Sequence, residues 1–574
     1  MGGIMGNFLK TQNTFSFGEI APEFYASNNS NGLSELKNID VLESGGLRRR
    51  RGLKKIANLA SSAIIVPFPI TESDKYLLVL SNLSVDIYKN DEKITTINAP
   101  WGTSDLSQLQ YAQRFNQIFF THPNYVPRVL TKTSSAFSLD EFAFSANSNA
   151  ITNMPFMQFD DATGVTITIT SSALGNNYAT FTTNIDFWTQ DAVGEKLCLN
   201  SKQWIVSSVQ NARVAIVYTS GGYSIPGDAV AEWYEGAFSD KRGWPQCVSF
   251  HQNRLVFGGT KFAPNSLWLS KVGDYYNFDA GTGLDDEAIY VTLLSAQHHQ
   301  ICTIVSSDKL QILTSVGEWA ISNSPLTPSN VNVKQHTSVG SMANRYLPPQ
   351  QVESSTVFIS ESGKDIRELD LDALGENYNA VDLCAFSKHL MTNPISMAYN
   401  QNTHQLFVVM NDGVIRVLNK YPSTEISAWG TYTTDGEFKY ISVLDNTTYV
   451  IVKRSSQFSL EKFDESCLND AGTYGFSYKI SAFPMIINGH NPTKIRARKI
   501  SVRVINTKTL FINGYRVEIP NGVFSDDNPG FCGDLSINLL GTENDTMKPL
   551  WTISSSEQLP ATILSVTTDG AYTI

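Results

Sequence analysis

The sequence predicts an all-β protein: a β-propeller of about seven blades, with an inserted small β-barrel domain and a C-terminal β domain. Three observations lead to this prediction. Helical periodicity is almost absent, short alternating runs recur with polar turns between them, and their spacing of about 40–55 residues leaves room for four strands per repeat. Repetition around an axis leaves few exposed strand edges, which is the physical basis of a propeller.

Hairpin-like units form the repeat. Each unit has an apolar or alternating run, a short polar turn and a second alternating run. The clearest turn is Asn411-Asp412-Gly413, because Asp and Gly accept the positive φ of tight hairpins. A β-sandwich with unrelated hairpins is the alternative. The units are Tyr76–Tyr88, Gln117–Leu130, Arg254–Leu269, Leu310–Ile321, Thr356–Leu369, Gln405–Leu418 and Thr448–Phe463.

The long gap between the second and third units, residues 146–240, has short strands of its own. Val165–Thr170 alternates strictly, and Lys196–Leu199, Trp204–Val209 and Arg213–Tyr218 follow with turn residues between them. A surface loop whose ends lie close together tolerates an added domain. The pattern therefore predicts a small β-barrel inserted between two blades.

The hairpin rhythm stops near residue 477, where a C-terminal β domain is expected. Its strongest strand is Lys494–Ile505, with Lys494, Arg496 and Arg498 on one face. From Lys499 the polar positions shift by one, and such a slip predicts a β-bulge. The expected organisation is an N-terminal arm with the start of the propeller (1–60), blades (61–145), the inserted domain (146–240), further blades (241–476) and a C-terminal β domain (477–574).

Composition limits the function. The net charge is −11, which argues against a general nucleic-acid binder, although an acidic protein can still let DNA slide past it. The N-terminus lacks the pattern of a signal peptide, and no run approaches the ~20 apolar residues of a membrane span, so no membrane insertion is expected. The six cysteines lack zinc spacing and are interpreted as reduced core residues: Cys198, Cys247, Cys302, Cys384, Cys467 and Cys532.

The sequence predicts no enzyme, no cofactor and no metal site. It contains no G-x-S-x-G, H-E-x-x-H, P-loop or Rossmann pattern. Ser315–Trp319 comes nearest to the Asp-box of propeller glycosidases but lacks the Asp. Sugar hydrolysis would require two carboxylates across the substrate, which the sequence alone leaves open.

Two stretches resemble a known family. Phe15–Gly52 begins F-S-F-G-E-I-A-P and ends in a Gly–Arg turn. Gly243–Asp286 contains a Trp-Pro start, N-R-L-V-F, W-L-S-K and G-D-Y-Y-N-F, and an acidic L-D-D-E-A run follows at its end. In order and spacing, these motifs resemble the nozzle proteins of short-tailed phages, the tail tubular protein B family. Together with Leu310–Leu326 and Pro328–Gly340 they cover about a fifth of the chain.

The resemblance implies a structural protein of the virion tail, assembled in the host cytoplasm. It implies a homohexameric ring below the portal and the head–tail adaptor protein, a propeller in each subunit, a nozzle for DNA ejection, and docking of tail fibre proteins outside. Residues 1–60 would then include the adaptor-contact region, the inserted domain would be a platform or fibre-dock candidate, and the C-terminal domain a nozzle or dock candidate. Genomic double-stranded DNA would then pass through the lumen with low affinity. Each phosphate that a basic side chain neutralises adds affinity, so a lumen with few such side chains would bind DNA weakly. The alternative function is a carbohydrate-binding or glycan-cleaving β-propeller of a phage tail tip.

Two basic clusters are the candidate sites. Arg48, Arg49, Arg50 and Arg51 are interpreted as an assembly contact, with a solvated strand and a DNA contact as alternatives. The basic strand formed by Lys494, Arg496 and Arg498 is interpreted as an interface, with a DNA track as the alternative.

Two further groups are interpreted as structural. Asp285, Asp286 and Glu287 fit a turn as well as a metal site. His298 and His299 are adjacent, so on a strand they would face opposite ways.

Overall fold

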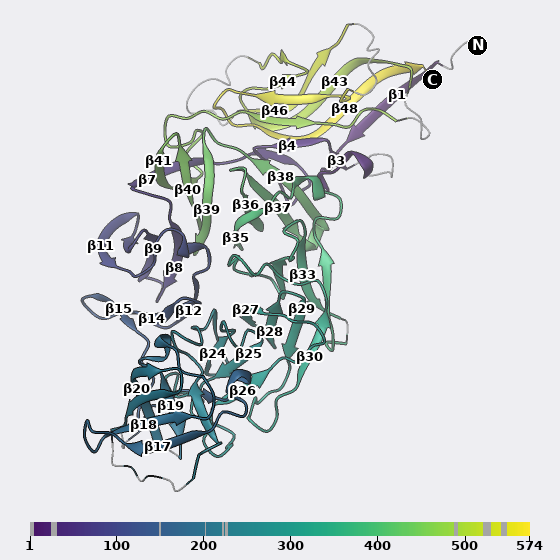
Figure 1. Ribbon diagram of the computed structural model, residues 1–574. Helices are drawn as coiled ribbons and strands as arrows, with labels where there is room; N and C mark the ends of the chain where they lie inside the picture. Colours follow the sequence, from purple (N-terminus) through teal and green to yellow (C-terminus); the bar gives the residue numbers. More distant parts are fainter. Residues whose placement is uncertain are drawn as a thin grey trace. The chain divides into compact units, whose positions relative to one another are not determined.

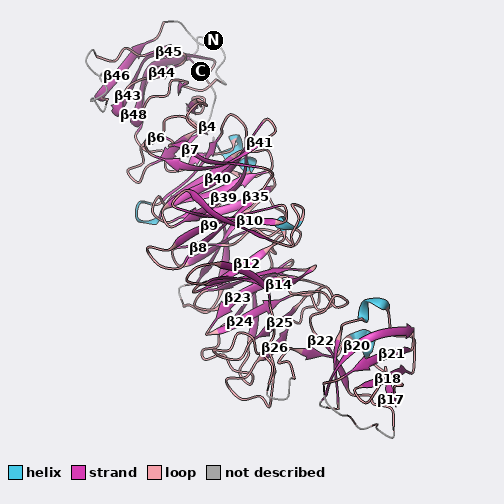
Figure 2. Cartoon of the chain, turned by 90° about the vertical axis from the view of Figure 1, so that its left-hand side faces the viewer, coloured by secondary structure: helices cyan, strands magenta, loops and turns pink. Residues whose placement is uncertain are grey.

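The computed structural model describes residues 5–24, 31–147, 151–200, 202–220, 223, 225, 228–372, 374–486, 492–520, 530–540 and 548–573. The chain divides into two compact units, Met1–Leu106 with Leu347–Ile574, and Ser107–Tyr346. Strands form nearly all of the regular structure (Figure 2). Seven four-stranded antiparallel sets recur among the described residues, which confirms an all-β propeller.

Four of these blades belong to the first unit, and in three of them the four strands follow chain order or its reverse. The last blade differs, because its fourth strand, β7 (Gly52–Leu59), comes from the start of the chain and pairs with β41. The other strands of these blades are β8 (Ile64–Pro69), β9 (Lys75–Ser81), β10 (Ser84–Lys89), β11 (Glu92–Asn98), β31 (Gln350–Val352), β32 (Ser355–Ile359), β33 (Ile366–Leu371), β34 (Tyr378–Asp382), β35 (Pro394–Asn400), β36 (Gln405–Met410), β37 (Ile415–Tyr421), β38 (Ile426–Tyr432), β39 (Glu437–Leu444), β40 (Thr447–Arg454) and β41 (Gln457–Asp464).

Three blades belong to the second unit. Neighbouring blades pack face to face through apolar side chains, such as Val256 and Leu267 of one blade and Ile312 and Ile321 of the next. The strands are β12 (Gln110–Arg114), β13 (Gln117–His122), β14 (Tyr125–Lys132), β15 (Phe137–Glu141), β23 (Cys247–His251), β24 (Arg254–Gly258), β25 (Ser266–Leu269), β26 (Ile289–Thr292), β27 (Ile301–Ser306), β28 (Leu310–Thr314), β29 (Gly317–Ile321) and β30 (Val333–Thr337).

The inserted region folds as a seven-stranded curled sheet around a core that contains Trp204 and Trp233. Its ends approach each other, because Ile167 bridges to Val230 and the Trp233 indole donates to the Val165 carbonyl over 2.9 Å. The expected small barrel is therefore a partly closed one. Its strands are β16 (Phe156–Met157), β17 (Ile167–Ser171), β18 (Tyr178–Thr183), β19 (Lys196–Leu199), β20 (Lys202–Asn211), β21 (Val214–Tyr218) and β22 (Trp233–Gly236).

The C-terminal domain includes the start of the chain. One sheet has the order β46-β43-β48-β6-β5, and β1 also pairs with β48. The second continues from blade β35–β38 through β4 into β42, β47, β44 and β45. The strands are β1 (Met5–Gln12), β2 (Gly18–Glu19), β3 (Gly32–Leu33), β4 (Glu35–Lys37), β5 (Ile39–Val41), β6 (Leu47–Arg49), β42 (Tyr478–Ser481), β43 (Lys494–Thr507), β44 (Phe511–Ile512), β45 (Tyr515–Arg516), β46 (Phe531–Asn538), β47 (Thr552–Ser555) and β48 (Thr562–Thr573).

One apolar core joins N-terminal residues such as Phe15 and Leu36 to C-terminal residues such as Ile500 and Ile553. Residues 1–60, expected as an N-terminal arm with the start of the propeller, are divided between this domain and the last blade, to which β7 belongs (Figure 1). Single 3₁₀ turns lie at Pro22–Phe24, Asp105–Ser107, Asp160–Ala162, Gln190–Ala192, Lys388–Leu390 and Pro422–Thr424.

All six cysteines are free, as expected, but only three are buried, and Cys532 is exposed, so the core interpretation is wrong for that residue. In the part of the chain that the structure describes, no helix has the length and apolar character needed to cross a membrane.

Candidate functional site

The arginine run lies where the chain leaves β6 for β7. Arg48 and Arg49 end β6, which is held between β5 and β48. The Arg48 side chain is 49% exposed and lies 4.0 Å from Asp40. Arg49 and Arg50 are buried, and Arg51 is half-buried. The four arginines therefore have different environments.

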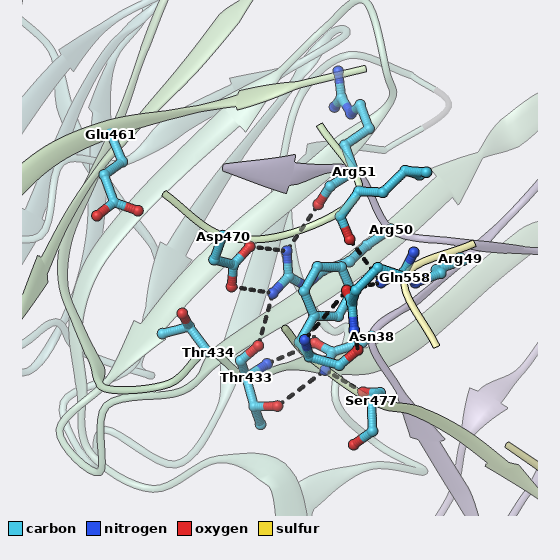
Figure 3. Close-up of polar contacts among 12 residues, drawn as sticks. Asn38, Arg49, Arg50, Arg51, Thr433, Thr434, Glu461, Asp470, Ser477 and Gln558 are labelled. Atoms are coloured by element: carbon cyan, nitrogen blue, oxygen red, sulfur yellow. Dashed lines mark hydrogen bonds and ion pairs between the residues drawn. The ribbon is translucent and has the colours of Figure 1, made fainter. Parts of the chain in front are cut away.

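Arg50 is a buried cation whose five N–H donors all have acceptors. Its guanidinium makes two bonds to the carboxylate of Asp470, at 2.8 and 3.1 Å. The Nε atom donates to Asn38 Oδ1 over 2.9 Å, and the remaining donors reach the carbonyls of Thr433 and Arg51, both over 2.8 Å. Figure 3 shows these contacts converging on one guanidinium. Arg50 thus joins the N-terminal arm, the end of β38 and the loop after β41.

Arg49 makes a second, adjoining connection to the C-terminal domain. It donates to the Leu468 carbonyl over 2.8 Å, to the Leu559 carbonyl over 3.2 Å and to Gln558. The Phe476 ring lies 4.4 Å from the Arg49 guanidinium and 3.5 Å from that of Arg50. Burial, followed by the charge of Arg50, lowers the pKa of Arg49 to about 10.

These contacts restrict the predicted assembly contact to two of the four arginines. The side chains of Arg49 and Arg50 are buried against this chain itself, so they do not present a surface to a partner. Sequence reasoning missed this role because Asn38, Asp470 and Gln558 are remote from the run in sequence. Arg48 and Arg51 keep exposed surface, and an assembly contact stays a prediction for them.

The basic strand is β43, and its bulge is confirmed. The pairing with β48 shifts between Ala497 and Lys499, which leaves Arg498 as the extra residue. Arg498 bends across β48, donates to Asn7 Oδ1 over 2.6 Å, and lies 3.8 Å from Asp569. Lys494 and Arg496 are exposed, so they remain the candidates for an interface on this strand.

The acidic run at the end of the second motif stretch forms a turn around Arg254. The Arg254 guanidinium is buried and donates to the carbonyls of Ser270, Asp285 and Glu287 over 2.5–2.9 Å. The Glu287 carboxylate accepts the backbone N–H groups of residues 282–284 over 2.6–2.8 Å, which lowers its pKa. The described residues contain no group of three or more side chains placed to hold a metal ion.

The two adjacent histidines have different environments. His298 is exposed, whereas His299 is buried and stacks on Trp319 with 5.8 Å between ring centroids. His299 also contacts the Gln297 carbonyl through Nδ1 at 3.0 Å. The different exposures agree with the expectation that these side chains do not share a ligand.

A buried charge cluster lies where the inserted domain returns to the blades, and sequence reasoning missed it. The Glu235 carboxylate accepts from Arg242 Nε and from Lys241 Nζ, each over 2.7 Å. Arg242 also makes two 2.8 Å bonds to the half-exposed Asp161. Glu195 lies 3.7 Å from Lys241 with 1% of its side chain exposed. The signal available in the sequence was the Lys241-Arg242 pair immediately before the second motif stretch.

Glu195 makes the stability of this cluster depend on pH. Burial, and then the charge of Glu235, raise its pKa from 4.5 to about 8. Between these values the folded chain holds a proton that the unfolded chain lacks, so stability falls as pH rises from about 4.5 to about 8. We expect Glu195→Gln to stabilise the protein at pH 8 by a few kcal/mol, since one pKa unit corresponds to about 1.4 kcal/mol.

Thermal unfolding of Glu195→Gln and of wild type between pH 4.5 and 8.5 measures this effect. The exposed Glu232→Gln provides the matched control, and its profile should follow wild type. Parallel profiles for Glu195→Gln and wild type would contradict the assignment.

An open pocket of about 530 Å³ lies beside the last blade, lined by Asp435, Arg454, Tyr474 and neighbouring polar residues. Arg454 is engaged by Glu461 and stacks on Tyr474, with its guanidinium 4.6 Å from the ring centroid. Asp435 is the one carboxylate among the described lining residues. Glycoside hydrolysis uses two carboxyl groups about 5–9.5 Å apart, and this pocket does not supply the pair.

Comparison with known proteins adds similarity at the level of fold. No family model and no curated protein matches the chain. Similar solved structures include BamB from Moraxella catarrhalis (11% identity, TM-score 0.34, 72% of this chain and 98% of that chain) and the RRP9 WD40 repeats (9%, 0.34, 72% and 98%). A lead-soaked BBS1N in complex with ARL6DN is a third (8%, 0.36, 73% and 99%). At these identities the likeness concerns the fold alone.

Proposed function

We propose that this chain is a structural subunit of a short phage tail, a ring-forming nozzle that makes the DNA ejection channel and docks the head–tail adaptor and tail fibres. The observation that carries the proposal is the pair of motif stretches, Phe15–Gly52 and Gly243–Asp286, that resemble this family in order and spacing. The contacts of their residues support a structural role.

The residues of the first stretch pack closely against other parts of the first unit. Phe15 is fully buried, and Gly18 has a φ of +60° with no room for a side chain, because a Cβ would lie 2.3 Å from the Trp429 carbonyl oxygen. The Glu19 carboxylate accepts the Leu36 N–H over 2.9 Å and lies 3.3 Å from His389 Nε2. Residues 25–30 of this stretch lie outside the described residues. The motif residues thus fix backbone, as a scaffold requires.

The second stretch is structural in the same sense, because Arg254 and Glu287 hold the turn at its end through backbone groups.

The net charge of the chain supports a role as a channel for DNA. A chain with a net charge of −11 repels phosphates as a whole, and a channel in which DNA binding released few counterions would let DNA slide. We place the protein in the virion tail, after assembly in the host cytoplasm.

Mass measurement tests the proposal. We expect the purified protein, or tails assembled with the portal and adaptor, to contain a closed ring of six copies, and we expect no release of reducing sugars from host polysaccharide. The assembled tail is included because some ring subunits associate only on an adaptor. A chain that stays monomeric and never joins the tail particle would overturn the proposal. Sugar release would favour the glycan-cleaving alternative.

A further inference from the structure

Two eight-residue strands, β1 and β46, lie at opposite ends of one run of paired strands in the C-terminal domain. The run is β46-β43-β48-β1, and each neighbouring pair is antiparallel. Figure 1 shows β1, in purple, running along the yellow β48. Among the described residues, β1 pairs only with β48 and β46 only with β43. Each strand therefore has one edge whose backbone groups have no strand partner in the described part of the chain.

Among the described residues, neither edge has strong protection against a further strand. Proteins usually protect sheet edges with proline, lysine or a covering segment. β1 has no proline and one lysine, and its Leu9 is 73% exposed. β46 also lacks proline, and its one charged residue, Asp534, is already paired with Arg503 at 2.8 and 2.9 Å. Lys10 of β1 is therefore the one charged side chain of these two strands without an ion pair in the described part of the chain, and an added strand would have to leave its ammonium group in water.

The direction of the strands favours one partner, a second copy of this chain. The two edge strands are the first and the last of four antiparallel strands, so β46 runs in the opposite direction to β1. In a ring whose axis follows the strands, rotation to the next copy preserves strand direction. β1 of one copy then meets β46 of the next in an antiparallel pair, which is the pairing used throughout this sheet. A head-to-tail contact of this kind is heterologous and closes into a ring.

The faces of the two strands match as well. Phe8 of β1 and Leu535 of β46 both pack on the same apolar core, so their inner faces would remain on one side of the joined sheet. The outer faces would bring Leu9 beside polar residues of β46 such as Ser536. Main-chain hydrogen bonds would supply affinity, as in other cases where a strand is added to a sheet edge.

We propose that β1 of each subunit pairs with β46 of the next and that this continuous sheet links the copies of the ring; the inference rests on the ring of the proposed function. Lys494 and Arg496 lie on β43 of the same sheet. A basic patch on this strand would then repeat around the assembly, beside each junction.

Disulfide trapping tests the pairing with the exposed native Cys532 of β46. Leu9→Cys and Thr11→Cys place a thiol on the outer face of β1. Asn13→Cys, directly after β1, lies opposite Cys532 in the register that brings Leu9 beside Ser536. Opposed Cβ atoms in an antiparallel pair lie about 4.5–5.5 Å apart, close to disulfide range. In oxidised, assembled tails we expect at least one variant to give a ladder of covalent multimers. The ladder should vanish with Cys532→Ser, and Ser73→Cys, exposed on a blade turn, should give none.

Charged substitutions on the two strands provide the second measurement. Leu9→Lys with Ser536→Lys would place like charges across the junction, and we expect the concentration needed for ring formation to rise about tenfold. Leu9→Lys with Ser536→Asp should restore it. Rings that form without a ladder from any of the three cysteine variants, and that tolerate the double lysine variant, would overturn the pairing and leave the proposed function standing. A chain that forms no ring, even on its adaptor, would overturn both.

Discussion

Arg50→Ala is expected to lower the free energy of unfolding of the first unit by about 3–5 kcal/mol, the usual cost of removing one member of a buried ion pair. The substitution leaves Asp470 with a fully buried carboxylate and no cation at 2.8 Å. It also removes donors from Asn38 and from two carbonyls. Calorimetric unfolding measures the loss of stability. Limited proteolysis should show earlier cleavage near Arg50 and Asp470.

Arg48→Ala is the matched control, because this neighbour has a half-exposed side chain and a 4.0 Å contact. Exposed substitutions of this kind usually change stability by no more than about 0.5 kcal/mol. Arg50→Ala with Asp470→Ala should recover part of the loss, because the double variant leaves no buried charge. Equal effects of Arg50→Ala and Arg48→Ala would contradict the buried role.

Arg242→Ala is expected to have an effect of similar size, about 3–5 kcal/mol, in the second unit. Arg242 balances Glu235, whose side chain is fully buried, and it stacks 4.1 Å from the Phe159 ring centroid. Without Arg242, Lys241 would remain as the cation beside both Glu235 and Glu195. We expect the inserted domain to unfold at a lower temperature than the rest of the chain.

Hydrogen exchange of residues 156–236 against the blades of the same unit would locate this loss. The control is Arg213→Ala, which breaks an exposed pair with Asp186 in the same domain. Exposed pairs contribute about 0–1 kcal/mol, so this variant should stay close to wild type. A uniform loss of protection over the unit, with no excess in the inserted domain, would argue against a local role for the cluster.

The sequence was informative where burial was strong. Every hairpin predicted from alternation lies within the two central strands of a blade, as Gln405–Leu418 does within β36 and β37. Several of these strands, such as β36 and β28, are buried on both faces, so their apolar pattern is strong. Strands such as β11 and β34 were missed because they are largely exposed and contain few apolar residues.

Long-range pairing limited the rest of the prediction. The N-terminal arm has short strands whose partners lie several hundred residues away, as Lys37 pairs with both Thr431 and Lys479. No local pattern encodes such a partner. For the same reason a run of four arginines looked like one surface feature, although Arg50 and Arg48 differ completely in exposure. The bulge at Arg498 could be predicted because a slip in alternation is local.

The pairing of β1 with β48 has a consequence for biosynthesis. Residues 5–12 find their partners only in residues 566–573, so the first strand made must wait for the last. At about 5–20 residues per second, the delay is roughly half a minute to two minutes. During that time β7 can complete the last blade as soon as β41 has emerged, whereas β1 stays unpaired. A chain that ended before residue 566 would therefore have its blades but would lack the residues with which β1 pairs.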